Sequence, residues 1–163
     1  MPLFLEKKLP KRKRKTFFGQ SSYNRSKLQV QNLRGEIYKF SILIPVKEEG
    51  RWEIFSYQEI ETLAELLDRD FGGSTYTPPL EATQHPLLIG RYRIGKEKVT
   101  NTHVRFEVYT QPNNVAIEYF QELKENLENY SRQVIVQRLQ ESGHATYTGE
   151  EQILIEYSLA IIL

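Results

Sequence analysis

The sequence feature that most constrains the fold is the alternation of apolar and polar residues from Thr102 to Thr110. One set is Val104, Phe106 and Val108, and the other is His103, Arg105, Glu107 and Tyr109. A repeat of two residues is typical of a β-strand with one buried face, because successive side chains of a strand point to opposite sides. We therefore predict a strand whose polar face is a candidate working surface.

A helix is predicted before this strand, from Tyr57 to Asp70. Ser56 and Glu59 have the spacing of a capping box, which begins a helix. Apolar residues then recur at a helical spacing along one face, namely Ile60, Leu63, Ala64, Leu67 and Phe71. Gly72 should end the helix, because glycine adopts the left-handed conformation without a steric penalty from Cβ.

A second helix is predicted to begin after Asn113 or Asn114, either of which can cap it. Its apolar stripe consists of Ile117, Phe120, Leu123, Leu127 and Tyr130. The next segment, residues 133–140, is compatible with a continued helix or with a strand. We predict a strand there, because three consecutive β-branched residues favour extended structure and an unbroken helix to Ser142 would be far longer than average.

Four other segments have strand patterns. The apolar run 39–46 predicts a central strand. Residues 85–94 predict a strand that forms an antiparallel hairpin with the 102–110 strand, and residues 30–36 are predicted to add an edge strand. The last segment, 152–163, is apolar on both faces beyond Tyr157, which indicates a strand either covered within the protein or packed against another subunit.

The order of these elements predicts an α+β fold of ferredoxin-like, split βαβ topology. Two helices would cover one face of an antiparallel sheet, and an extra C-terminal strand would be added to the sheet. A chain of 163 residues fits one compact domain. We predict a single domain over residues 30–163, preceded by a flexible arm over residues 1–29.

The predicted arm is strongly basic, although the whole chain has a net charge of only +1. Residues 1–39 contain 11 Lys or Arg and two acids, whereas residues 40–163 contain 11 Lys or Arg and 19 acids. The most basic run includes Lys11, Arg12, Lys13, Arg14 and Lys15, which can neutralise phosphates without a fixed geometry. A solvated tail, a segment folded onto the acidic body and an arm that docks a partner are the alternatives.

The arm and the helix-free sheet face are therefore candidate surfaces for nucleic acid or an acidic protein. The polar faces of the two hairpin strands should lie together, so the predicted sheet contacts are Arg91, Arg93, Arg105 and Tyr109. Ferredoxin-like domains can bind RNA by stacking bases on sheet aromatics. The aromatic signature of RNA-recognition motifs does not occur in this sequence, so topology alone supports that use.

The alternative is a small metal-independent nuclease that uses the same face. His103 or His85 would act as general acid or base, and Arg105 would stabilise phosphate charge. Glu107 or Tyr109 would orient these groups. A solvated face or an ion pair between strands produces the same line of side chains, so we favour a non-enzymatic interaction or nucleic-acid-binding protein.

The composition predicts neither a cofactor nor a resident metal. The chain has no Cys, which excludes disulfides, thiolate catalysis and Cys-containing metal sites, and its three His are widely separated. No segment reaches the roughly 18 apolar residues that cross a bilayer, so we expect no membrane partner. We predict a cytoplasmic protein that forms a homo-oligomer through its C-terminal strand.

The segment from Arg51 to Thr110 resembles a family of small uncharacterised bacterial proteins. The resemblance rests on a helix that ends in the sequence FGGST, residues 71–75, and on the strand motif GRYR, residues 90–93. In that family the turn is F-x-x-G-x-T-like and the strand is G-x-W-R-like, so Tyr92 stands where the pattern has Trp. The resemblance covers about a third of the chain and implies a fold without an activity.

Overall fold

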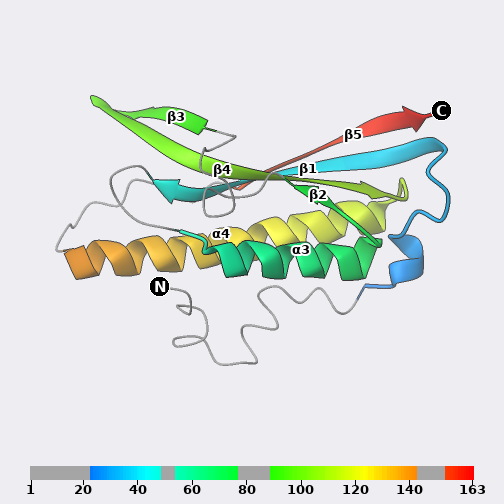
Figure 1. Cartoon of the computed structure of the whole chain (residues 1–163), viewed down its shortest axis with the longest axis horizontal. Helices are drawn as coiled ribbons and strands as arrows, with labels where there is room; N and C mark the ends of the chain where they lie inside the picture. The colour runs from blue at the N-terminus through cyan, green and yellow to red at the C-terminus, as the bar shows by residue number, and fades with distance from the viewer. Residues whose placement is uncertain (1–22, 49–53, 77–88, 143–152) are drawn as a thin grey trace.

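The computed structural model describes residues 23–48, 54–76, 89–142 and 153–163. Its elements in chain order are the 3-10 turn η1 (Arg25–Lys27), β1 (Gly35–Glu48), α3 (Tyr57–Phe71), β2 (Thr75–Tyr76), β3 (Ile89–Ile94), β4 (Glu97–Thr110), α4 (Asn114–Ser142) and β5 (Leu154–Ile162). The long strands form one antiparallel sheet, and both helices lie on the same face of it (Figure 1).

The sheet confirms the predicted α+β, ferredoxin-like arrangement. The strand order is β2-β4-β1-β5, and β3 also pairs with β4. β4 therefore lies between β1 and β3, and β1 lies between β4 and β5, which is the split βαβ pattern. The predicted C-terminal strand is present, and it is the edge strand next to β1.

The predicted strand over residues 133–140 is wrong, because α4 continues to Ser142. Leu127, Tyr130 and Val134 are all buried, so the helical spacing of apolar residues continues through this segment. Burial of that stripe outweighs the helix-propensity deficit of β-branched residues, which is under about 0.7 kcal/mol per residue. A helix of 29 residues is about 43 Å long and matches the length of the 14-residue strands β1 and β4.

The first helix has the ends that the sequence predicts. The Ser56 hydroxyl accepts a hydrogen bond from the Glu59 amide at 3.1 Å, and Gly72 ends α3 with a φ of 85°. The second cap is Asn113, whose side-chain oxygen accepts from the Ala116 amide at 3.1 Å.

Two strand boundaries differ from the prediction. Residues 30–34 are not in a strand, and β1 begins at Gly35, so the separate edge strand over 30–36 is wrong. β4 begins at Glu97 instead of Thr102, because the hairpin turn is only two residues long. Gly95 opens this turn with a φ of 62°, a conformation that suits glycine at the first central position of a tight hairpin turn.

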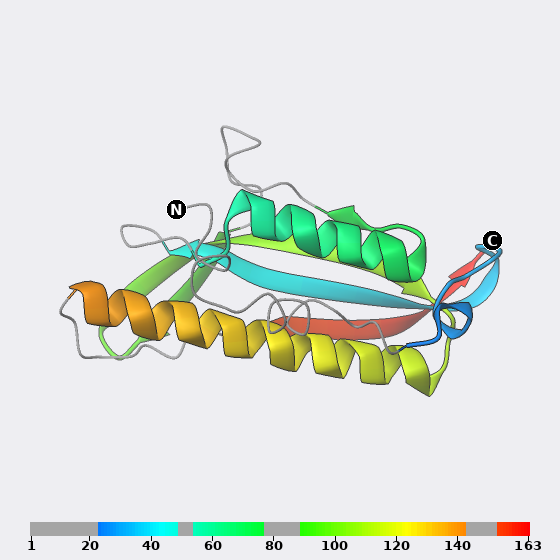
Figure 2. The ribbon, with the colours of Figure 1, turned by 90° about the horizontal axis from the view of Figure 1, so that it is seen from below.

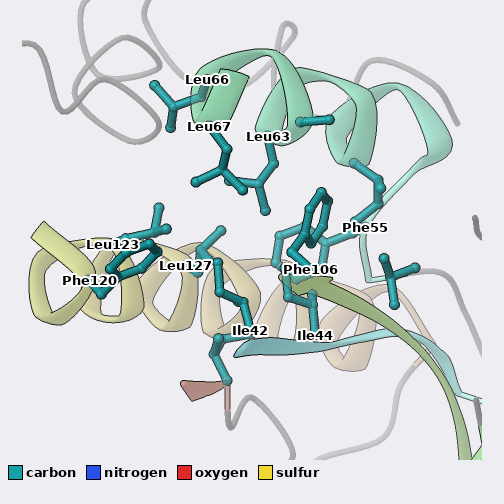
Figure 3. Packing of buried hydrophobic residues seen from close by; sticks show 14 of the residues in the cluster. Ile42, Ile44, Phe55, Leu63, Leu66, Leu67, Phe106, Phe120, Leu123 and Leu127 are labelled. Carbon is teal, nitrogen blue, oxygen red and sulfur yellow. The ribbon is translucent and has the colours of Figure 1, made fainter. Parts of the chain in front are cut away.

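The core lies between the helices and the central strands. Leu63 and Leu67 of α3 and Leu123 and Leu127 of α4 point toward Ile42, Ile44 and Phe106 of the sheet (Figure 3). A series of aromatic contacts crosses this core: Phe120 stacks on Phe71 at 5.2 Å and on Phe40 at 4.0 Å, and Phe40 stacks on Tyr157 at 5.2 Å. The aromatic series therefore joins both helices to β1 and to the edge strand β5.

The helical state of residues 133–140 can be tested at Gln133, which is exposed in α4. We expect Gln133→Ala to be more stable than Gln133→Val by about 0.5 kcal/mol, because valine loses side-chain freedom in a helix. Urea unfolding of the two variants measures this difference. A strand would give the reverse order, since valine is the better strand former.

Candidate interaction surfaces

The polar row of β4 lies on the sheet face opposite the helices. Its apolar counterparts Val104, Phe106 and Val108 are buried in the core, as predicted. Along the row the exposure varies: Arg105 is exposed, and Glu107 and Tyr109 are half-buried. His103 is only 6% exposed and lies opposite Pro45 of β1, beside a β-bulge. The buried position of His103 gives a substrate less access than the nuclease hypothesis needs.

Glu107 in this row makes an ion pair with the neighbouring strand. Its Oε1 lies 3.5 Å from Nζ of Lys39, and both side chains are about one-third exposed. A pair of this exposure contributes between about 0 and 1 kcal/mol. Glu107 therefore links β4 to β1, as an ion pair between strands.

Arg91 and Arg93 do not join the polar row, which corrects the sequence prediction. Arg91 pairs with Thr100 and Arg93 pairs with Lys98, whereas the row occupies the odd-numbered positions of β4. Residues that face each other across a hairpin lie on the same side of the sheet, so the two arginines lie on the opposite side from Arg105. The two-residue turn causes this result, because it pairs odd positions of β3 with even positions of β4.

The β3–β4 hairpin instead carries its own cationic cluster. Residues 89–100 contain four Lys or Arg and one acid. The four side chains, Arg91, Arg93, Lys96 and Lys98, are all exposed. Arg93 lies directly opposite Lys98, and like charges at such positions destabilise a strand pair. We call these four residues the basic hairpin.

Other predicted site residues lie outside the part of the chain that the structure describes. These are His85 and the basic run Lys11, Arg12, Lys13, Arg14 and Lys15. The chain that follows the run is anchored from Tyr23 onward. Leu28 is fully buried in the core, so the folded part begins earlier than the predicted boundary at residue 30.

Side chains from the residues just before α4 hold this N-terminal segment in place. The Gln111 amide nitrogen donates to the carbonyl oxygens of Ser26 and Gln29 at 3.0 and 2.7 Å. The Asn113 amide donates to the Lys27 carbonyl oxygen at 2.8 Å. The described segment over residues 23–29 therefore lies at the end of the domain at which α3 stops and α4 begins (Figure 2).

β5 presents an exposed apolar edge that the sequence indicated. Tyr157, Leu159 and Ile161 lie on its helix side, opposite Phe40, Tyr38 and Glu36 of β1. They are nevertheless 50%, 54% and 70% exposed, because the C-terminal end of β5 rises away from the helix layer (Figure 1). Leu154 on the other side is 48% exposed. We call the unpaired edge of this strand, with the exposed side chains of Leu154, Tyr157, Leu159 and Ile161, the β5 edge.

A buried carboxylate at the end of α3 escaped the sequence analysis. Asp70 is 2% exposed, and its Oδ2 accepts a hydrogen bond from the Tyr119 hydroxyl at 2.6 Å. Arg69 donates to both carboxylate oxygens at 2.9 and 3.1 Å, and Arg25 lies 3.5 Å from Oδ1. Asp70 was expected only as the polar end of a helix, and nothing in the helical spacing indicated a partner 49 residues away.

The surroundings of this carboxylate also change tyrosine ionisation. Burial, followed by the hydrogen bond to Asp70, raises the pKa of Tyr119 well above its ordinary value. Burial and the bond to Glu122 likewise raise the pKa of Tyr23, whose ring packs edge-on against Tyr119 at 5.2 Å. The described partners of Asp70 come from η1, α3 and α4, so the carboxylate links these three elements.

Neither a metal centre nor a membrane span is found in the described residues. No group of three or more potential ligands is gathered there that could hold a metal ion. Within the same ranges, neither helix combines the length and the apolar character needed to cross a bilayer.

Replacement of Tyr119 tests the buried cluster. We expect Tyr119→Phe to lower the free energy of unfolding by about 1.5–3 kcal/mol near pH 7, because Asp70 loses a donor in a buried site. The raised pKa means that the unfolded chain releases the tyrosine proton first, so this contribution is complete below about pH 10 and declines as the pH rises further. The variant should therefore show a flatter loss of stability above about pH 10. Urea unfolding of both proteins near pH 7 and at several pH values above about pH 10 measures this. If the free energy of unfolding falls equally steeply with pH in the variant and the wild type, the prediction is contradicted.

Comparison with known proteins gives no relative. No family model matches the sequence. No curated protein matches it, and no solved structure matches the fold. The resemblance of residues 51–110 to a family of small bacterial proteins stays a prediction, and function has to be argued from the surfaces.

Proposed function

We propose that this chain is a non-enzymatic interaction protein that associates with another protein strand through the β5 edge. The observation that carries the proposal is the exposure of Tyr157, Leu159 and Ile161 on one strand at the edge of the sheet. An edge strand offers backbone N–H and C=O groups that can pair with another strand, and proteins usually protect such edges.

Within β5 itself, the residues that usually protect a sheet edge are missing. The strand contains no Pro, Lys or Gly, and its single charged residue is Glu156. Among the described strands it pairs only with β1. A regular, apolar and nearly uncharged edge of nine residues is therefore suited to strand addition.

Substitution of Leu159 tests this proposal. We expect the full chain to sediment and scatter light as a species larger than a monomer, and Leu159→Lys to lower the association constant at least tenfold. The charge would have to be buried beside an apolar partner strand, which is costly. Analytical ultracentrifugation over a range of concentrations measures the change.

Leu33 supplies a matched control for that experiment. It is 52% exposed, close to the 54% of Leu159, but it lies outside the sheet. Leu33→Lys should leave the assembly unchanged. A wild-type chain that is monomeric at every concentration and carries no co-purifying protein would refute the proposal.

A second candidate function is binding of nucleic acid. The observation that favours it is the basic hairpin, in which Arg93 and Lys98 face each other in spite of their repulsion. A phosphate backbone would relieve that repulsion, and a two-stranded ribbon fits the major groove of DNA. The basic run of the arm would add contacts that need no fixed geometry.

A salt titration tests this second function. We expect binding of a labelled duplex at low salt, with a salt slope that falls by roughly one for each phosphate contact removed. The variant carries Arg91→Gln, Arg93→Gln and Lys98→Gln. A control with Lys124→Gln, Arg34→Gln and Arg132→Gln removes the same charge elsewhere.

The outcomes separate the remaining alternatives. Equal weakening by both variants would assign binding to net charge alone, and no binding at low salt would refute the function. Arg105→Ala and deletion of residues 1–20 show how much the open sheet face and the arm contribute. Cleavage of the probe that is lost in a His103→Ala, Arg105→Ala variant would support the nuclease alternative instead.

A further inference from the structure

We infer that the partner of the β5 edge is a second copy of this chain, paired antiparallel about a two-fold axis at Ser158. This inference rests on the proposed association through β5 and specifies its partner and its register. The two sheets would then form one continuous sheet with all four helices on the same face.

Symmetry restricts the possible registers. In a two-fold antiparallel pair, residues that face each other lie on the same side of the sheet. The axis must therefore pass between the two copies of one residue, so that odd-numbered residues face odd-numbered residues and even face even. An axis at Ser158, the midpoint of Leu154–Ile162, pairs all nine residues of the strand. Other positions of the axis leave one end of β5 outside the pairing.

The side chains are complementary in this register. On the helix side, Tyr157 faces Leu159 of the other copy and Ile155 faces Ile161. On the other side, Glu156 faces Ala160. An axis at Glu156 would place two carboxylates opposite each other, which destabilises a strand pair. The register at Ser158 therefore avoids repulsion and joins apolar residues on the helix side.

The exposed side chains of β5 supply part of the surface that a dimer buries. Half-exposed large side chains contribute on the order of 100 Å² each. The four side chains of the β5 edge thus give roughly 400 Å² per copy, about half of the ~800 Å² per partner of a standard interface. The strand backbone and neighbouring surface of α4 would supply the rest.

Tyr157 is also fixed before association. Its ring packs on Phe40 at 5.2 Å and on Tyr38 at 5.1 Å, and Phe40 stacks on Phe120 in the core. A side chain that is already held in place loses less conformational freedom when it binds. Tyrosine is among the residues that contribute most to protein interfaces.

The absence of Cys from the sequence allows a direct test. In Ser158→Cys, any disulfide must join two chains, and facing Cα atoms of antiparallel strands lie about 4.5–5.5 Å apart, within the range that a disulfide spans. We expect mild oxidation of the full chain to give mostly covalent dimer on non-reducing electrophoresis. Thr75 is exposed on β2, which lies at the opposite edge of the sheet. Thr75→Cys should give at least tenfold less covalent dimer.

The register is checked by mixing two variants. Tyr157→Cys and Leu159→Cys should cross-link to each other more readily than either does to itself, and mass spectrometry distinguishes these products. Cross-linking no faster than that of Thr75→Cys would overturn the inference. If such a chain still associates and Leu159→Lys weakens the association, the β5 edge has another partner or register and the proposed function stands. If the chain is monomeric but co-purifies with another protein, only the inference fails. If it is monomeric and carries no co-purifying protein, both fail.

Discussion

The contact of Phe40 with Phe120 and Tyr157 is the interaction on which the layers of this protein depend. Phe40 lies in the central strand β1, stacks on α4 at 4.0 Å and supports the ring of the edge strand at 5.2 Å. Phe120 in turn stacks on Phe71 at the end of α3. Four elements distant in the sequence therefore share one aromatic series, which positions β5 although much of that strand is exposed.

Most of the fold could be predicted because its signals are local. Alternation at Val104, Phe106 and Val108 and the cap at Ser56 depend only on nearby residues, and the structure has both. The segment 133–140 could not be predicted in the same way. Its β-branched residues favour a strand locally, whereas Val134 and Ile135 are buried by a sheet long enough to cover a 29-residue helix.

The positions of the candidate site residues were harder to predict, because they depend on a turn length and on contacts between residues distant in the sequence. The length of one turn decided the side of the sheet on which Arg91 and Arg93 lie, since a change of one residue reverses every side chain of a hairpin strand. The Asp70–Tyr119 bond joins residues from different helices, and no periodicity signals such a pair. The apolar end of β5 was visible in the sequence, because it is apolar on both faces and too short for a membrane span.

The two candidate surfaces lie at opposite edges of the sheet. β5 pairs with β1, whereas the basic hairpin is attached to β4. Association through β5 would therefore leave a basic hairpin at each outer side of the assembly. If β5 pairs with a second strand, its outer amides become hydrogen-bonded on association, and hydrogen exchange on residues 154–162 measures this. We expect slower exchange at high protein concentration and faster exchange on dilution, with residues 89–94 unchanged. Exchange in β5 that does not depend on concentration, in a chain that associates, would contradict it.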